Sequence, residues 1–356
     1  MTATLQTLAK LKPKERQKMN IPSADRNPAQ GRIPEGTKRV VIFDTNAYRN
    51  FVPKGSFADS RVTAIRLRQC EQASSVFVLA SPTVIWELTA HLADHKDRFY
   101  NQCLKSLVII GEHAVNPANL AGGLSLFPDS ESSVCRELFH CVPKLNEDGV
   151  RNLGSFVRHV SKNAPDLSDQ RAQDQIRQIT SQVDAAEKAW LKSMQPVLER
   201  CDPTAAKQFF GNVPEMELRK KMRDFFVTPN FVDMWAGFTV LMHAAKVRYT
   251  ITSEADLNLK KKIVLDAFPV PVKLMSSLLQ KIAMDPNFKL GDPNHKRWNY
   301  IWDNQLTFSI GKSHQVADAP LYFVTSDGEV INAAKDANCQ ERVLALPDYL
   351  KSVGFN

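Results

Sequence analysis

The stretch Arg39-Val-Val-Ile-Phe-Asp44-Thr45-Asn46 is the strongest indication of the fold. A short apolar run that ends in polar residues is typical of a strand buried on both faces of a sheet. Further runs of this kind are residues 76–80, 321–325 and 342–346. Helical patterns separate the runs, and strands that alternate with helices form parallel sheets. The sequence therefore predicts an α/β fold in which helices flank a parallel sheet.

The predicted strands lie towards the two ends of the chain, and residues 98–290 between them show almost no strand pattern. Apolar residues recur there at helical spacing, and the clearest stripe indicates one long amphipathic helix that Pro196 should end or kink. This stripe could be the seam of a homodimer, although packing onto its own domain is the more usual arrangement. Its residues are Ile176, Ile179, Val183, Ala186, Trp190, Met194 and Val197.

The composition is that of a globular protein with a sizeable core. The chain has 356 residues, of which 43% are apolar, and this length suggests about two domains. The net charge is +8, and residues 1–39 hold nine Lys or Arg residues against three acids. We expect residues 1–37 to form a flexible basic arm that either contacts phosphates or stays solvated.

The cysteines and the hydropathy bear on the compartment. Six cysteines without a C-x-x-C pair indicate free thiols in a reducing cytosol and give little support to a cysteine zinc site. No apolar run has the length of a membrane span, and the first residues lack the apolar segment of a signal peptide. We therefore expect a cytoplasmic protein that does not contact a membrane.

Four acidic residues lie close to predicted strand ends. Asp44 and Asp327 follow the first and third strands, Glu87 lies in the helix after the second strand, and Asp303 lies in the helix before the third. Ligands bind at the carboxyl ends of parallel strands, so these carboxylates could meet in one cleft. Carboxylates that converge repel one another, and Mg²⁺ or Mn²⁺ removes this cost. Taken singly, each acid could instead be a helix cap or a surface residue.

The set of motifs resembles the PIN-domain nuclease family. The first motif is a strand that ends in Asp-Thr-Asn, at Val40–Asn46, and the second is Ser-Pro followed by a helical Glu, at Ser81–Leu88. The third and fourth are a helical acid at Asp303 and a strand that ends in Thr-Ser-Asp, at Val324–Asp327. The resemblance covers about residues 40–98 and 292–356.

The resemblance implies a metal site and a reaction. The four acids named above would hold one or two Mg²⁺ or Mn²⁺ ions, and an activated water would cleave RNA and leave 5′-phosphate and 3′-hydroxyl ends. The supporting polar residues would be Thr45, Asn46, Thr325 and Ser326. PIN domains are usually shorter than this chain, which implies two PIN-like halves, 38–97 and 291–356, separated by a helical insertion at 98–290.

The physiological role is a wider expectation. PIN proteins include toxins of toxin–antitoxin pairs, phage-defence effectors and RNA-processing enzymes, and the insertion would select the substrate or bind a regulatory protein. Two alternatives remain open, a non-catalytic PIN-like scaffold that binds RNA or protein and a DNA-directed flap-type nuclease. The chain lacks the glycine-rich phosphate loops and the G-x-S-x-G elbow, which disfavours P-loop nucleotide hydrolysis and serine hydrolase chemistry.

Two further patterns lie near the acids. Lys296 and Arg297 precede Asp303, and their charges could hold substrate phosphates. His91 and His95 follow Glu87 at a spacing of four residues. If the helix continues, these three side chains share one face, which is a possible zinc pair. A polar face that points outwards is the more common arrangement for such histidines.

Overall fold

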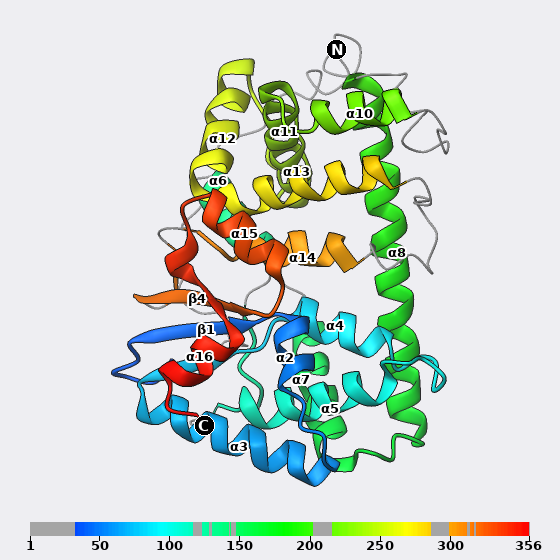
Figure 1. Cartoon of the computed structure of the whole chain (residues 1–356), viewed down its shortest axis with the longest axis vertical. Coiled ribbons are helices and arrows are strands. Elements are labelled where there is room, and N and C mark those ends of the chain that lie inside the picture. Colours follow the sequence, from blue (N-terminus) through cyan, green and yellow to red (C-terminus); the bar gives the residue numbers. More distant parts are fainter. Residues whose placement is uncertain are drawn as a thin grey trace, which may run out of the picture.

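The strands predicted at both ends of the chain form a single sheet. The computed structural model describes residues 33–116, 123–127, 130–141, 143, 147–201, 216–285, 299–311, 314–316 and 318–355. A small, mainly parallel sheet lies among many helices (Figure 1), which confirms the predicted α/β class. Its strands are β1 (Arg39–Phe43), β2 (Val76–Leu79), β3 (Gln315–Val316), β4 (Ala319–Thr325) and β5 (Val343–Ala345).

The sheet topology brings the two ends of the chain together. β1 pairs in parallel with β2 on one side and with β4 on the other, so that Val40 lies opposite both Phe77 and Leu321. β4 also pairs in parallel with β5, and the short β3 is antiparallel to its start. The four apolar residues of β1 after Arg39 are at most 1% exposed. Both faces of the sheet are therefore covered, which explains the unbroken apolar run.

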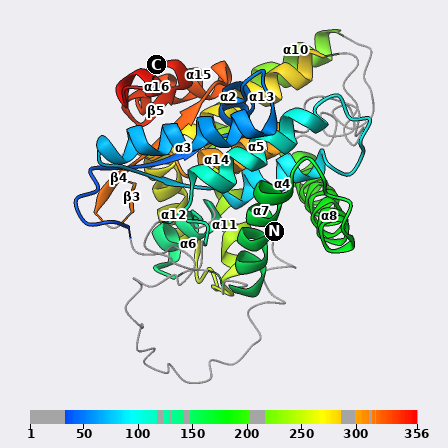
Figure 2. The same ribbon diagram turned by 90° about the horizontal axis from the view of Figure 1, so that it is seen from below.

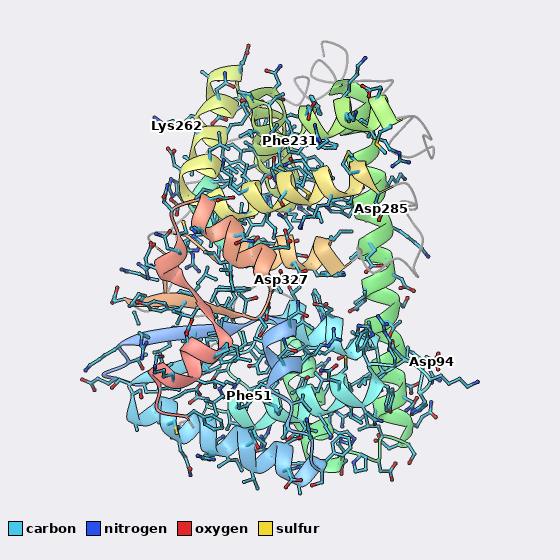
Figure 3. All side chains as sticks on the ribbon, viewed as in Figure 1. Phe51, Asp94, Phe231, Lys262, Asp285 and Asp327 are labelled. Atoms are coloured by element: carbon cyan, nitrogen blue, oxygen red, sulfur yellow. The ribbon has the colours of Figure 1, made fainter. Side chains whose placement is uncertain are left out.

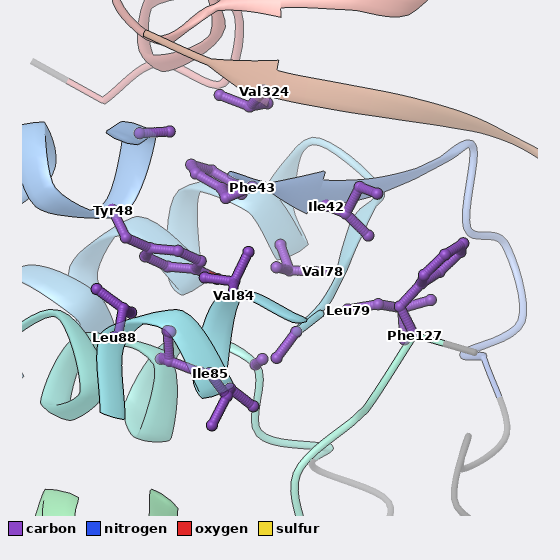
Figure 4. Close-up of a cluster of buried hydrophobic side chains, with 14 of the residues drawn as sticks. Ile42, Phe43, Tyr48, Val78, Leu79, Val84, Ile85, Leu88, Phe127 and Val324 are labelled. Carbon is purple, nitrogen blue, oxygen red and sulfur yellow. The ribbon is translucent and has the colours of Figure 1, made fainter. Parts of the chain in front are cut away.

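The largest hydrophobic core joins the sheet to helices from both halves of the chain. Figure 4 shows Tyr48, Val84 and Ile85 packed beneath Phe43 of β1. The helices whose side chains enter this core include α2 (Thr45–Phe51), α3 (Phe57–Ala73), α4 (Pro82–Ala90), α5 (Tyr100–His113), α7 (Glu147–Asn163), α15 (Gly328–Asp336) and α16 (Leu346–Ser352). Part of the predicted insertion therefore packs directly on the sheet.

A second core lies in the later part of residues 98–290. Its centre includes Phe231 (Figure 3), Trp235 and Phe268, and Phe308 joins it from the segment that returns to the sheet. Its helices are α6 (Ser130–Phe139), α10 (Met216–Phe225), α11 (Pro229–Lys246), α12 (Glu254–Ala267) and α13 (Pro269–Met284). As predicted, helices dominate residues 98–290 wherever the structure describes them. The domain boundaries themselves stay a prediction.

The predicted long helix is α8 (Gln170–Cys201). It runs along one side of the molecule, from the helices beside the sheet to the helices of the second core (Figures 1 and 2). Ile176, Ile179 and Val183 of its stripe are buried in the core beside the sheet. Of the two effects predicted for Pro196, ending the helix does not occur, because the helix continues to Cys201, and a kink stays a prediction.

A buried polar network, which we call the Glu71 network, connects four helices next to Phe43 of β1. His113 Nε2 lies 2.7 and 2.8 Å from the two carboxyl oxygens of Glu71, and the Tyr349 hydroxyl donates to Glu71 Oε1 at 2.6 Å. The Tyr48 hydroxyl lies 3.3 Å from His113 Nδ1. All four side chains are at most 1% exposed. Buried polar groups are stable when they are paired in this way.

The helix boundaries bear on two of the expectations from the sequence. The helix that holds Glu87 ends at Ala90, so His91 and His95 do not continue its face, and the premise of a zinc pair is wrong. His91 Nδ1 instead contacts Asp97 Oδ2 at 2.7 Å. In the described part of the chain no single helix reaches the length and apolarity of a membrane span. Two bent helix pairs reach them only when both members are taken together.

Candidate active site

The four predicted acids come from four elements of the fold. Asp44 follows β1 and is the N-cap of α2, and Asp327 follows β4 and is the N-cap of α15. Because β1 and β4 are parallel neighbours, both residues lie at the carboxyl edge of the sheet. Glu87 is on α4, and Asp303 is on α14 (Asn299–Thr307). Asp327 lies in the middle of the molecule between the sheet and the upper helices (Figure 3).

Two threonine hydroxyls connect the acids across elements. The Thr325 hydroxyl at the end of β4 donates to Asp44 Oδ2, while Asp44 Oδ1 accepts the backbone N–H of Ala47 at 2.5 Å. The Thr45 hydroxyl donates to Glu87 Oε2 at 2.5 Å. These bonds fix the orientation of two carboxylates that are 1% and 6% exposed. The roles of helix cap and site residue therefore coexist at Asp44.

The remaining supporting residues lie around Asp327. Asn46 Nδ2 donates to Asp327 Oδ2 at 3.4 Å, and Asp327 Oδ1 accepts the backbone N–H of Glu329 at 2.7 Å. The Thr325 hydroxyl also accepts the backbone N–H of Asp327 at 2.8 Å. Ser326, which lies between Thr325 and Asp327 in the sequence, is half-buried. The structure thus gathers the Asp-Thr-Asn and Thr-Ser-Asp motifs at one place.

Burial makes the charged forms of these carboxyls costly. Burial raises the pKa of Asp44 to about 7, although the hydrogen bonds from Thr325 and Ala47 lower it. The charges of Asp327 and Glu87 raise this pKa further. Burial likewise raises the pKa of Glu87 to about 7, although the hydrogen bond from Thr45 lowers it. Carboxyls with such values hold protons near neutral pH unless positive charge compensates them.

Asp303 is the least compensated member of the set. It is 7% exposed, and no hydrogen bond from a described residue is among the influences on the pKa of its carboxyl. Burial raises its pKa well above the usual value, and the charges of Glu87, Asp44 and Asp327 add to the shift. Asp303 therefore lies in the field of the other three acids. We refer to Asp44, Glu87, Asp303 and Asp327 together as the acid cluster.

Sequence reasoning missed two charged residues beside the acid cluster. Arg49 of α2 lowers the pKa of Glu87, whereas Glu187 of α8 raises it. Glu187 Oε1 accepts the indole N–H of Trp302 at 3.0 Å, and Trp302 directly precedes Asp303. The position of Arg49, one helical turn after Asn46, was a signal available in the sequence. Glu187 gave none, because its approach depends on how α8 packs.

The donor set fits a hard divalent cation in its chemistry. Four carboxylates supply the oxygen ligands that Mg²⁺ and Mn²⁺ prefer, and the cation would offset both burial and mutual repulsion. In the described residues, however, no three His, Cys, Asp or Glu side chains already stand close enough to hold an ion together. The carboxyls that are hydrogen-bonded to Thr45 and Thr325 would therefore have to turn towards the ion.

The predicted phosphate contacts, Lys296 and Arg297, lie outside the described residues. The basic cluster at 219–221 is partly structural, because Arg219 is buried and donates to the backbone oxygens of Ala283 and Asp285.

Comparisons of the chain with protein-family models, with curated proteins and with solved structures found no match.

Proposed function

We propose that this chain is a Mg²⁺- or Mn²⁺-dependent endoribonuclease built on a PIN-like fold with a helical insertion. The observation that supports the proposal is that four acids from separate elements lie within one another's electrostatic influence, two of them at the carboxyl edge of the parallel sheet. Three of these acids have raised pKa values. A protein gains no stability from burying charges that repel one another, and such arrangements cluster at functional sites.

The chain's own residues would position the reaction. Thr325 and the Ala47 amide hold Asp44, Thr45 holds Glu87, and Asn46 holds Asp327. When bound, Mg²⁺ or Mn²⁺ supplies Lewis acidity that activates water at neutral pH and stabilises charge on the leaving oxygen. Arg49 adds positive charge on the side of Glu87. This charge would help to attract the phosphodiester.

The test is cleavage of labelled RNA by the full chain in Mg²⁺, in Mn²⁺ and in EDTA, with flap DNA as a parallel substrate. We expect RNA cleavage in both metals and none in EDTA, with 5′-phosphate on the products. Asp44→Asn and Asp303→Asn should abolish cleavage. Asp94→Asn is the matched control, because Asp94 is an exposed acid in the loop after α4, away from Asp327 (Figure 3). Cleavage of flap DNA alone would favour the DNA-directed alternative.

One observation favours a second candidate, a PIN-like scaffold without catalysis. The carboxyls of Asp44, Glu87 and Asp327 are already hydrogen-bonded within the protein, and the described donors do not form a ready-made ion site. A scaffold would bind RNA or protein but would not gain thermal stability from Mg²⁺ or Mn²⁺. A melting temperature unchanged by either ion, together with no cleavage of RNA or DNA, would establish this alternative.

The wider expectations rest on this proposal. They are a cytoplasmic location, a role as a toxin or phage-defence effector, a regulatory protein that binds the insertion, and a homodimer. The mass of the full chain in solution tests the dimer directly.

A further inference from the structure

Two arginine side chains lie against the same aromatic ring. The guanidinium carbon of Arg49 is 3.9 Å from the ring centroid of Phe99, and that of Arg98 is 4.4 Å from the same centroid. Arg49 is on α2, and the other two residues lie between α4 and α5. We call these three side chains the arginine platform. Arg98 is exposed and the other two are half-buried, so the platform is open to solvent.

The ring of Phe99 is fixed by its neighbours in the chain. Asp97 Oδ1 accepts the backbone N–H of Phe99 at 2.7 Å, and Asp97 Oδ2 lies 2.7 Å from His91 Nδ1. The ring of His91 packs edge-on against the ring of Phe99, with the two centroids 5.7 Å apart. The segment after α4 therefore presents Phe99 as a fixed surface, and both oxygens of Asp97 are already in use.

The guanidinium of Arg49 is oriented by a second partner, Gln102 of α5. Its Nε and Nη2 each lie 3.4 Å from Gln102 Oε1, and Gln102 Nε2 donates to the backbone oxygen of Arg49 at 2.9 Å. A guanidinium carries its N–H donors in a planar fork, so these bonds leave the donors at its outer end available. Two donors side by side bind two oxygens of one phosphate, which is the strong form of arginine–phosphate contact.

The charges of the platform have no matching acid. Within the described residues, neither arginine forms an ion pair. The charge of Arg98 acts on Asp97, but Asp97 pairs with His91. Cation–π attraction explains why each arginine contacts the ring, but it does not remove the repulsion between the two positive charges. A bound anion would remove it.

The platform lies within electrostatic reach of the acid cluster. The charge of Arg49 acts on Glu87, whose carboxyl accepts the Thr45 hydroxyl rather than an arginine N–H. Arg49 and Thr45 are both on α2, and Phe99 follows the helix that carries Glu87. The same two helices thus place an uncompensated positive site next to a group of acids that would bind cations. A phosphodiester strand bridges such a pair of sites, because its phosphates bind both metal ions and guanidinium groups.

We propose that the arginine platform holds the RNA backbone by its phosphates beside the acid cluster. The assignment to RNA rests on the proposed function. The cleaved phosphate would lie at the acid cluster, and the platform would bind a nearby phosphate of the same strand. Arg49 and Arg98 would therefore be positioning residues that add affinity and orientation, and they would not take part in the chemical step.

The test is binding of a fluorescein-labelled single-stranded RNA to the full chain, followed by fluorescence anisotropy in EDTA at pH 6 over a series of salt concentrations. EDTA prevents cleavage, and at pH 6 the raised pKa values of Asp44 and Glu87 keep their carboxyls largely protonated. The slope of log Kd against log salt concentration reports how many phosphates the protein contacts. We expect Arg49→Gln and Arg98→Gln each to reduce this slope by about 0.7 and to weaken binding about tenfold.

Two further variants separate phosphate contact from folding and from general charge. Arg49→Lys keeps the positive charge but loses the fork, so it should weaken binding and leave the salt slope unchanged. Lys262→Gln is the matched control, because Lys262 is an exposed cation on α12, far from Asp94 in the segment that carries Arg98 (Figure 3). It should change neither quantity. A variant that is merely less stable would have a smaller folded fraction but the slope of the wild type.

The outcomes distinguish this proposal from the proposed nuclease activity. An unchanged slope in both Arg49→Gln and Arg98→Gln would overturn the platform, as would an equal reduction in Lys262→Gln. Absence of RNA binding by the wild-type chain would overturn it as well. A failed cleavage assay would leave the binding result unaffected, because binding is measured without metal.

Discussion

The Glu71 network holds one buried carboxyl and the acid cluster holds four carboxyls, and the surroundings of the two sets are opposite. The carboxyl of Glu71 contacts the His113 ring nitrogen and accepts a hydrogen bond from the Tyr349 hydroxyl, so polar partners surround it. Asp303 is also buried, but the charges of three other carboxylates act on it and no described residue donates a hydrogen bond to it. The first arrangement stabilises the fold, whereas the second costs stability and needs a function to explain it.

The largest expected difference between the two regions is in catalysis. Asp303→Asn should lower the initial rate of RNA cleavage by about 10³-fold or more, because it removes a carboxylate that the proposal assigns to holding the metal ion. Glu71→Gln should leave the rate per folded molecule within a few-fold of wild type. The comparison fails if the folded fractions of both variants, measured by circular dichroism, cleave RNA equally well.

The expected effects on stability have the opposite order, because the change in the Glu71 network should cost more stability than the change in the acid cluster. Glu71→Ala leaves the Tyr349 hydroxyl and a His113 ring nitrogen buried without their partner, and we expect a loss of about 3–5 kcal/mol in the free energy of unfolding. Asp303→Asn removes a repelled charge and should stabilise the metal-free chain or leave it unchanged. Urea denaturation in EDTA measures both. An equal loss of stability in the two variants would show that the acid cluster is a structural network.

Much of this arrangement could be predicted from local sequence patterns. The four buried apolar runs became β1, β2, β4 and β5, because a strand covered on both faces must be apolar throughout. The end of α4 at Ala90 could not be foreseen, since it reflects side chains that bond to nearby backbone. Asp97 accepts the Phe99 N–H and contacts His91, and such bonds compete with the helix.

The site was predictable only in part. Asp44 and Asp327 follow runs that read clearly as strands, and parallel neighbours must end at the same edge of the sheet. Glu187 approaches the site through the packing of a distant helix on α14, which no local pattern encodes. A cavity of about 890 Å³ between α4, α6, α7, α8, α11 and α14 has the same origin. Ile179, Val183, Ala186 and Trp190 of the amphipathic stripe line it, and the first two are also part of the core beside the sheet.

The pH dependence of stability should reflect the raised pKa values in the acid cluster. The pKa values of Asp44 and Glu87 are raised to about 7 in the folded chain. Between about pH 4 and 7 the folded state therefore holds protons that the unfolded chain has released, and stability falls as the pH rises. In EDTA we expect the melting temperature to drop by roughly 5 °C or more from pH 5 to pH 8. Asp44→Asn should reduce this drop, and a flat profile in the wild type would contradict the raised pKa values.

The smallest expected effect concerns Glu187, where the insertion meets the acid cluster. Glu187→Gln keeps an oxygen that can accept the Trp302 N–H but removes the charge that raises the pKa of Glu87. The pKa of Glu87 should therefore fall, and the pH at which the metal-free chain loses stability should move down by less than about one unit.

Asp184→Asn is the matched control for this last change. Asp184 acts on Glu187 but is not among the charges that shift Glu87. If only Glu187→Gln moves the profile, α8 influences the acid cluster through charge. If both variants move it equally, the effect is a general loss of negative charge on α8, and the insertion has no specific electrostatic connection to the site.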